Sequence, residues 1–274
     1  MNNQFSKHLA SGAVLLFAAL VTHCGQSTAA PSPQSSSQQT AQDKGSGMKT
    51  PKTDSDSDSL SLAKQLADKA AAGASRLPQK MRDTFQKGID TVRESGIEKS
   101  AKQKGDQAVD GELKGWDGKS VKLSELWKDG PVVLMWYRGG WCPYCNIQLR
   151  AMQQSLDKIK NTGARLVVLT PELPEKAKAT AEANDLDLVA LHDKDSQLAK
   201  GYGILFDLPA PILPMYRDRL KLAEQNGTDA MQLPLAATYV IDSSGKITYA
   251  FLDADYKKRA EPSDVIEAVK AAVK

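Results

Sequence analysis

The sequence predicts an α/β protein in which helices flank a central mixed sheet, preceded by a helical extension. From about residue 105 to the end of the 274-residue chain, short runs of strand-forming apolar residues alternate with helical patterns. Such alternation is typical of α/β sheets. Upstream, an apolar leader is followed by a polar stretch and then by an amphipathic segment. We therefore expect four segments, with bounds 1–24, 25–59, 60–104 and 105–274.

The first segment is predicted to be an export signal. Lys7 precedes an apolar stretch over 9–21, which is shorter than a bilayer-spanning helix needs and has the layout of a secretory signal. An uncleaved anchor is the alternative. Cleavage after Ala30 would release a soluble protein, whereas the sequence around Cys24 resembles a lipobox, in which the cysteine carries a lipid. The predicted location is the periplasm, or the membrane through a lipid at Cys24.

Residues 25–59 are predicted to be a disordered tether. They are almost all Ser, Gln, Ala, Pro, Thr, Asp and Gly, and they cannot bury enough apolar surface to offset the entropy of ordering. The Asp-Ser alternation over 54–59 is interpreted as solvated linker, because it lacks the closing Glu of a cation loop. The net charge of +3 is spread along the chain, so no nucleic-acid partner is predicted.

The third segment is predicted to form two helices separated by Pro78. Its apolar residues recur at helical spacing: Leu60, Leu62, Leu66, Ala67, Ala70, Leu77, Met81, Phe85, Ile89 and Val92. We expect this stripe to pack against the following domain; a membrane or partner surface is the alternative.

The elements of the last segment follow from periodicity and turn residues. In chain order we expect a hairpin over 113–123 turning at Asp117-Gly118, a buried strand over 131–137, a helix from Pro143 to about Lys160, a strand over 165–170, a helix over 174–184, a strand over 186–191, a short helix over 196–202, a Pro-rich insertion over 206–234 with a helical piece around 215–225, a hairpin over 238–252 and a helix over 262–273.

The cysteines point to redox chemistry. Only three are present, and Cys24 belongs to the export region, so the folded domain holds the single pair Cys142 and Cys145. Four-thiolate zinc is excluded, and His192 is the only histidine beyond the leader. A permanent bridge is the alternative to a redox pair, but closing so small a loop would stabilise the fold little.

The surroundings of the pair favour a reactive thiolate. Cys142 is expected where a buried strand ends and a helix begins, and a helix N-terminus favours the anion. The three-residue spacing brings the second sulfur one turn along, close to the first. Residues expected to support the thiolate or form its pocket are Arg138, Gly140, Trp141, Pro143, Tyr144 and Arg150.

The stretch 136–150, with Tyr-Arg-Gly-Gly-Trp-Cys-Pro-Tyr-Cys-Asn at its centre, resembles the peroxiredoxin-like branch of the AhpC/TSA family in the thioredoxin superfamily. The resemblance extends to 169–174, 239–242 and 253–262, and covers about 60–274. It implies a thioredoxin-like fold and reduction of hydrogen peroxide or organic hydroperoxides. It also implies recycling by a thioredoxin-like or other dithiol reductant, with no bound cofactor or metal.

Two other functions remain open. Cys-Pro-Tyr-Cys resembles the glutaredoxin active site, which would make the protein a general thiol-disulfide oxidoreductase. Two soft thiolates in an exported domain would also suit a copper or other metal carrier.

The sequence also leaves open which sulfur attacks. Helix geometry favours Cys142 as nucleophile and Cys145 as resolving thiol. Laying the peroxiredoxin Thr-x-x-Cys over Cys142-Pro143-Tyr144-Cys145 instead puts the nucleophile at Cys145, whereas aligning Cys-Pro returns it to Cys142.

Overall fold

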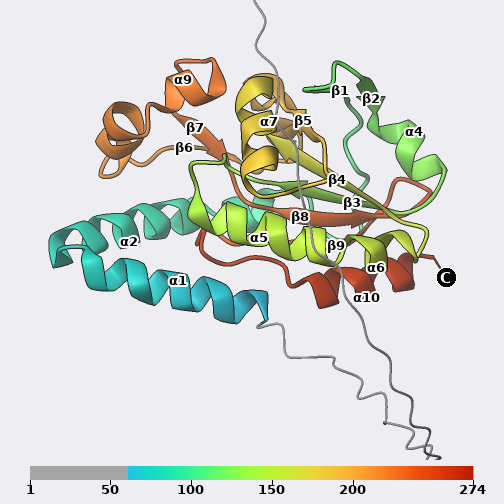
Figure 1. Cartoon of the computed structure of the whole chain (residues 1–274), viewed down its shortest axis with the longest axis horizontal. Helices are drawn as coiled ribbons and strands as arrows, with labels where there is room; N and C mark the ends of the chain where they lie inside the picture. The colour runs from blue at the N-terminus through green and yellow to red at the C-terminus, as the bar shows by residue number, and fades with distance from the viewer. Residues whose placement is uncertain (1–60, 274) are drawn as a thin grey trace, which may run out of the picture. The chain divides into compact units, whose positions relative to one another are not determined.

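The computed structural model describes residues 61–273, which form a central sheet with helices on both sides (Figure 1). The predicted leader (1–24), the possible lipid site at Cys24, the predicted tether (25–59) and Leu60 lie outside the described residues.

Seven strands form the central sheet, in the order β2-β1-β5-β4-β3-β8-β9. Their bounds are β1 (Glu112–Gly115), β2 (Ser120–Lys122), β3 (Val132–Trp136), β4 (Arg165–Thr170), β5 (Ala190–His192), β8 (Thr238–Ile241) and β9 (Ile247–Phe251). The strand β4 runs parallel to β3 and β5, whereas the β1/β2 and β8/β9 pairs are antiparallel hairpins. The sheet is therefore mixed, as predicted.

Helices cover both faces of this sheet. They are α4 (Leu123–Lys128), α5 (Pro143–Gln154), α6 (Leu156–Lys160), α7 (Pro174–Ala183), the short η1 (Lys194–Ser196), α8 (Gln197–Gly201) and α10 (Pro262–Ala272). The first face packs against α4 and α8, and the second against α5, α6, α7 and α10.

The central strand β3 is buried on both faces. Val132, Leu134 and Trp136 enter one core, and Val133 and Met135 enter the other. Because successive side chains of a strand point to opposite faces, a strand covered twice must be apolar throughout. This explains the continuous apolar run in the sequence.

Two predicted elements differ in extent. The single helix expected from Pro143 to about Lys160 is two helices, α5 and α6, which meet at Ser155. The strand expected over 186–191 is shorter and begins only at Ala190. Asp185 takes a left-handed conformation (φ 53°) after α7, and the N–H of Leu186 bonds back to Ala181, so the chain joins the sheet later.

The Pro-rich insertion contains a two-stranded ribbon that the sequence analysis missed. The strands β6 (Leu205–Asp207) and β7 (Gln232–Pro234) pair antiparallel, and between them lie a π-helical turn, η2 (Met215–Arg219), and the short helix α9 (Leu222–Asn226). The helical piece expected around 215–225 is thus divided in two. The insertion has a small core of its own, centred on Leu208, Ile212, Tyr216, Leu222 and Leu233.

The helical extension consists of α1 (Leu62–Arg76), α2 (Gln79–Glu94) and α3 (Ile97–Ser100), with Pro78 between the first two as predicted. None of the helices within 61–273 is both long and apolar enough to cross a bilayer. Leu62 and Leu66 pack against Ala151 of α5, and Val92 and Ile97 enter the core of the first sheet face. The expectation that the stripe packs on the domain is confirmed for Leu62, Leu66 and Val92.

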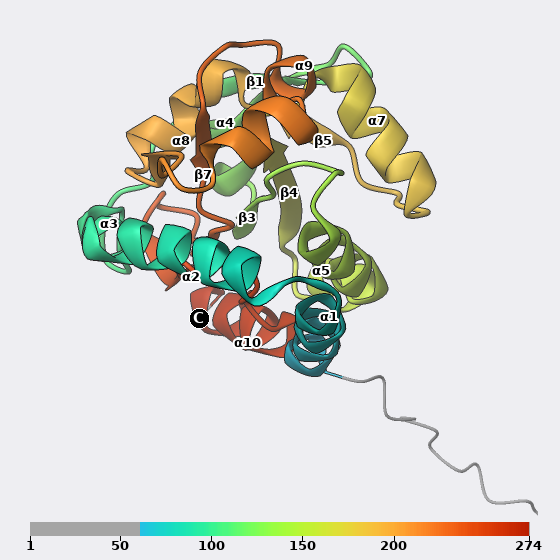
Figure 2. The ribbon, with the colours of Figure 1, turned by 90° about the vertical axis from the view of Figure 1, so that its left-hand side faces the viewer.

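A carboxylate fixes the start of α1. Glu261, at the N-cap of α10, accepts the N–H of Leu62 through Oε2 at 3.1 Å and that of Ala63 through Oε1 at 2.6 Å. Figure 2 shows α1 beside α5 and α10. A negative charge on free N–H groups at a helix N-terminus is stabilising, so Glu261 ties the extension to the domain.

Replacing Glu261 by alanine is expected to lower the free energy of unfolding by about 1–2 kcal/mol, because two helix N–H groups lose their acceptor. This corresponds to a fall in Tm of roughly 2–8 °C in a domain of this size. Thermal unfolding of the reduced protein measures it. The control is Glu267→Ala on the same helix, whose exposed pair with Lys270 should contribute little; equal effects of the two changes would contradict the prediction.

Candidate redox site

The cysteine pair lies where β3 passes into α5. Cys142 is the N-cap residue of α5, Pro143 is its first residue, and Cys145 lies one turn along, with its N–H bonded to the Cys142 carbonyl at 3.0 Å. Both thiols are free, and the exposed fractions of the two residues are 2% and 0%. The predicted placement at a strand-to-helix junction is confirmed.

Two glycines make the turn before the helix possible. Gly139 has φ +148°, and a Cβ on it would lie 2.1 Å from Trp141 Nε1; a Cβ on Gly140 would lie 1.9 Å from Thr180 Oγ1. The turn therefore requires glycine, and the reason is close packing within the protein.

The donors converge on Cys145. Its Sγ accepts the backbone N–H of Arg138 at 3.4 Å and an N–H from Arg259 Nη2 at 3.3 Å, and the Cys142 thiol also hydrogen-bonds to it. Arg138 and Arg259 are both buried. One guanidinium and one main-chain N–H thus donate to a fully buried sulfur, and the charge of Arg138 also acts on it.

These contacts separate the two thiols chemically. Burial by itself raises the pKa of Cys145, but the hydrogen bond from Cys142 and the guanidinium groups of Arg259 and Arg138 outweigh it, so the pKa lies well below the usual range. The hydrogen bond to Cys145, and then burial, raise the pKa of Cys142. The arrangement therefore favours the thiolate form at Cys145 over the thiolate form at Cys142.

Arg138 sits in an aromatic cage. Its guanidinium carbon lies 5.2 Å from the ring centroid of Trp141, 5.5 Å from that of Tyr216 and 4.5 Å from that of Tyr256, and its Nη2 donates to the Tyr216 hydroxyl. Burial lowers its pKa, but Tyr216 and the two cysteines more than compensate, so the pKa is raised and the group stays charged. Of the predicted pocket residues, Arg138 thus reaches Cys145 through its backbone N–H, and Trp141 lies under the Arg138 guanidinium.

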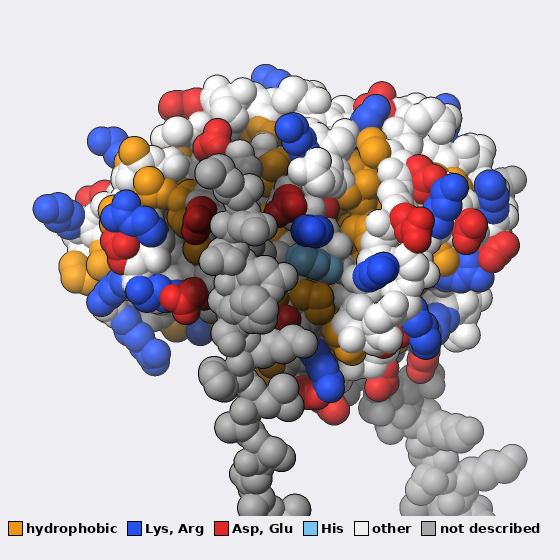
Figure 3. All heavy atoms as spheres, turned by 90° about the horizontal axis from the view of Figure 1, so that it is seen from above, with side chains coloured by type: hydrophobic (Ala, Val, Ile, Leu, Met, Phe, Trp, Pro, Cys, Tyr) orange, Lys and Arg blue, Asp and Glu red, His pale blue; other side chains and the backbone are white. Residues whose placement is uncertain are grey.

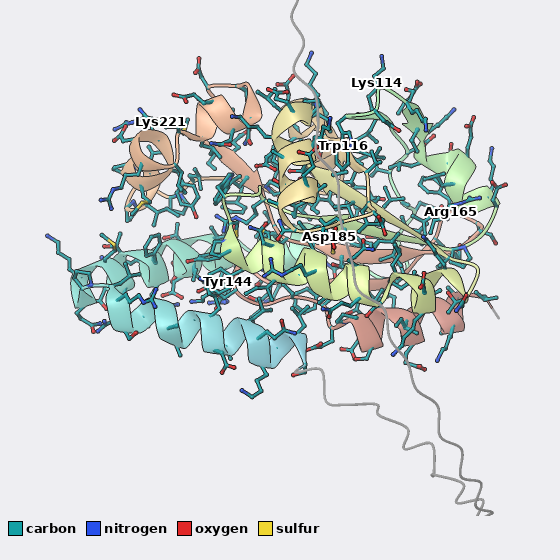
Figure 4. All side chains as sticks on the ribbon, in the orientation of Figure 1. Lys114, Trp116, Tyr144, Arg165, Asp185 and Lys221 are labelled. Carbon is teal, nitrogen blue, oxygen red and sulfur yellow. The ribbon has the colours of Figure 1, made fainter. Side chains whose placement is uncertain are left out.

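Tyr144 and Arg150 have different surroundings. Tyr144 lies between α5 and α1 (Figure 4) and meets the edge of Tyr256, with 5.5 Å between ring centroids, so it forms part of the wall. The structure does not bring Arg150 to the thiols: its exposed guanidinium donates to Asn184 Oδ1 at 2.5 Å. Five residues along a helix turn a side chain by about 140°, which carries Arg150 away from Cys145.

Comparison with known proteins decides the family. The family model described as the AhpC/TSA family matches residues 104–250, more than half of the chain. The chain belongs to the AhpC/TSA family. Its relatives include peroxiredoxin Q of Triticum aestivum chloroplasts, 31% identical over 139 residues that make up 51% of this chain and 54% of the relative. Peroxiredoxin Bcp of Escherichia coli is 27% identical over 100 residues, 36% of this chain and 64% of the relative.

The chain spans about half the length of the first plant relatives that it matches. Among solved structures, a mutant of PrxQ from Xylella fastidiosa superposes with a TM-score of 0.51 at 14% identity, covering 64% of this chain and 99% of that one. A peroxiredoxin-like protein from Aquifex aeolicus gives 0.50 at 17% identity, covering 63% and 88%. These similarities show the thioredoxin-like fold that the sequence predicted.

Part of the site lies outside the residues that the AhpC/TSA model matches. Arg259 follows that match, 114 positions after Cys145, and the sequence analysis did not assign it a role. The helices α1 and α2 precede the match. Tyr216 and Tyr256 were also missed. The signal for Tyr256 and Arg259 was their place in the stretch 253–262, to which the family resemblance extends, because nothing local ties them to the cysteines.

Glu172 is another functional candidate that the sequence analysis missed. It is buried beside the turn, where Oε1 accepts the Gly140 N–H at 2.8 Å, and Oε2 lies 3.5 Å from Thr180 Oγ1. The Tyr137 hydroxyl donates to the same carboxylate. Burial raises the pKa of Glu172 despite these donors. The turn that carries Cys142 therefore rests on a buried titratable group.

Glu172→Gln is expected to remove a pH dependence of stability. The pKa of glutamate in the unfolded chain is ~4.3, and the pKa of Glu172 in the folded protein is higher. The stability that the protonated carboxyl contributes is therefore present below the unfolded pKa and is lost as the pH rises through the folded pKa. The free energy of unfolding of the variant minus that of the wild type should thus increase between about pH 4 and 8. Urea unfolding measures it, with the exposed Glu182→Gln on α7 as control. A flat difference for Glu172→Gln would refute the prediction.

His192 is not part of the redox site. It is half-buried at the end of β5, opposite Lys114 of β1, and lines a surface groove formed by 109–115, 192–198 and neighbouring residues, among which neither cysteine occurs. Burial lowers its pKa. Figure 3 shows acidic and basic side chains interspersed over the face of the domain that is seen from above Figure 1. Among the described residues, no group of three or more His, Cys, Asp or Glu side chains is placed to hold a metal.

Proposed function

We propose that the protein is a thiol-dependent peroxidase that reduces hydrogen peroxide or organic hydroperoxides. The observation that carries this proposal is the convergence of Arg259, the Arg138 N–H and the Cys142 thiol on Cys145 Sγ. Peroxide reduction needs a thiolate, and it needs donors that stabilise charge on the departing oxygen. Membership of the AhpC/TSA family agrees with both.

In the proposed reaction the Cys145 thiolate attacks the nearer peroxide oxygen. A sulfur–oxygen bond forms, the O–O bond breaks, and the second oxygen leaves as water or an alcohol after taking a proton; the sulfur becomes a sulfenic acid. The Cys142 sulfur then displaces hydroxide from that sulfenic acid, giving a disulfide and water. This reverses the order that helix geometry favoured. Both guanidinium charges act on each of the two sulfurs, but the hydrogen bonds from Arg259 and from the Arg138 N–H go to Cys145.

A thioredoxin-like dithiol is the proposed reductant. It supplies the two electrons that reopen the Cys142–Cys145 disulfide, so no bound cofactor is needed. In the reduced state both sulfurs are buried, which suits a small peroxide better than a protein disulfide as the first substrate. A dithiol reductant would act on the oxidised form of the site, in which Cys142 and Cys145 form a disulfide.

Peroxide consumption coupled to thioredoxin and its reductase tests the proposal. We expect saturable turnover that depends on peroxide, together with stoichiometric sulfenic acid when the resolving thiol is absent. Rapid exchange with disulfides without peroxide turnover would instead support a general thiol-disulfide oxidoreductase. Stoichiometric copper that survives a competing chelator, and is lost on replacing either cysteine, would support a metal carrier.

We also propose that the protein works outside the cytoplasm, as a periplasmic protein or a lipoprotein anchored at Cys24. The basic start and apolar stretch of the leader support this. Cell fractionation and the mass of the mature N-terminus test it: cleavage before Cys24 with an added lipid indicates the anchor, and cleavage after Ala30 the soluble form. Full-length chain in the cytosol would overturn the proposal.

A further inference from the structure

Residues 253–261 form the loop before α10 (Figure 1) and bring two side chains to the redox site. Arg259 Nη2 donates to Cys145 Sγ at 3.3 Å, and the ring centroid of Tyr256 lies 4.5 Å from the guanidinium carbon of Arg138. The position of the 253–261 loop therefore decides whether a cation donates to the Cys145 sulfur.

The backbone of this loop fixes the Arg259 guanidinium. Nη1 donates to the carbonyls of Tyr256 and Lys258 within the loop, and the buried Nε has no hydrogen-bond partner. The two aspartates of the loop are paired with other cations. Three backbone N–H groups of the loop bond to Asp253 and Asp255, which gives the loop a defined shape. A shift of the loop would thus carry Arg259 away from the sulfur.

The helical extension holds one end of the loop. Glu98, in the first turn of α3, accepts the Ala254 N–H through Oε1 at 2.5 Å. Arg93 of α2 pairs with Asp253 at 3.4 Å, but it is an exposed residue, and ion pairs of exposed side chains contribute little. A hydrogen bond to a carboxylate is stronger than a neutral one, so Glu98 is the main polar attachment at this end.

The extension also holds the other end. Glu261 accepts the N–H groups of Leu62 and Ala63 at the start of α1, at 3.1 and 2.6 Å. Arg259 thus lies between the two attachments. A carboxylate close to a thiolate disfavours it by charge repulsion, so any support that Glu98 and Glu261 give to Cys145 must act through the loop.

We propose that Glu98 and Glu261 are positioning residues of the redox site: by holding the two ends of the 253–261 loop, they place the Arg259 guanidinium on Cys145. The inference rests on the proposed function in one respect, that Cys145 is the attacking thiolate. It gives the extension a part in the chemistry of the site in addition to its packing on the domain. The helices α1 and α3 lie before the residues that the family model matches.

Glu98→Ala in the full-length protein, in the Cys142→Ser background, tests the proposal. The measured quantity is the rate at which iodoacetamide alkylates Cys145, followed by mass spectrometry across a pH series. The midpoint of the profile should move to higher pH, with about two- to fivefold less thiolate at a pH below it, because Arg259 is held less well on the sulfur. Loss of a negative charge alone would move the midpoint to lower pH. Glu98→Gln keeps an acceptor oxygen for the Ala254 N–H, so its midpoint should lie at or below that of its parent.

A double-mutant cycle tests whether the effect passes through Arg259. If Glu98 acts by placing this residue, Glu98→Ala should cause no further shift in a protein that already carries Arg259→Gln. Glu261→Ala tests the other end of the loop in the same way. The matched controls are the exposed Glu94→Ala on α2 and Glu267→Ala on α10, whose midpoints should equal that of the parent. The plateau rate at high pH reports access to the buried thiol, which separates a general loosening of the fold from a change in the midpoint.

Shifts to higher pH in both alanine variants, absent when Arg259→Gln is present, would support the proposal. Unchanged midpoints, or shifts of the same size without Arg259, would overturn it. Alkylation needs no peroxide, so peroxide turnover decides separately on the proposed function. A protein that turns over no peroxide but shows the Arg259-dependent shifts would refute the peroxidase and retain the positioning role.

Discussion

Replacing Cys145 by serine is expected to abolish peroxide-dependent turnover and sulfenic acid formation. Cys142→Ser should still consume one equivalent of peroxide and then stop, because the thiolate that attacks is present but the thiol that resolves the sulfenic acid is not. The reason is the placement of Arg259 and the Arg138 N–H on Cys145 Sγ.

Trapping with a sulfenic-acid reagent and mass spectrometry distinguishes the two variants. Each is reduced, exposed to one equivalent of peroxide and quenched. Label on Cys145 in the Cys142→Ser protein agrees with the proposed order. Label on Cys142 in the Cys145→Ser protein, at the wild-type rate, would instead make Cys142 the nucleophile, as the helix N-terminus alone suggested.

Replacing Arg259 by glutamine should shift the reactivity of Cys145 to higher pH. A cation within hydrogen-bonding distance lowers a thiol pKa by roughly one unit or more, so its loss should leave about tenfold less thiolate, or less still, at a pH below the pKa of both proteins. The reactive fraction rises as pH increases through the thiol pKa, and the profile of the variant should lie at higher pH. Arg259→Lys keeps the charge but loses the planar guanidinium donor. Its pH profile of Cys145 reactivity should therefore lie between the profiles of the parent protein and of Arg259→Gln.

Alkylation by iodoacetamide across a pH series, in the Cys142→Ser background, measures this shift for a single thiol. The matched control is Arg150→Gln. Arg150 is close to Cys145 in sequence, but its exposed guanidinium binds Asn184, so its profile should follow that of its parent. A profile unchanged by Arg259→Gln, or moved equally by both changes, would show that Arg259 does not stabilise the thiolate.

Local patterns were enough to predict most of the helices and strands. The run before Trp136 predicted a strand buried on both faces, because only such a strand is apolar at every position, and Pro143 after Cys142 predicted a helix start. Where the prediction failed, a non-local or conformational effect intervened. The left-handed conformation of Asp185 makes β5 begin later than predicted. The β6/β7 ribbon pairs the two ends of the insertion, which are distant in sequence, so no periodicity reveals it.

The sequence by itself determined the α/β class, the extension and the position of the cysteine pair at a helix N-terminus, because each depends on neighbouring residues. Only the tertiary structure decided which residues surround the pair. Arg259 reaches Cys145 from the loop before α10, and Arg150, much closer in sequence, points away. Chain proximity does not determine which charge faces a sulfur. The fold does, because it brings side chains from distant elements into one buried site where their charges interact strongly.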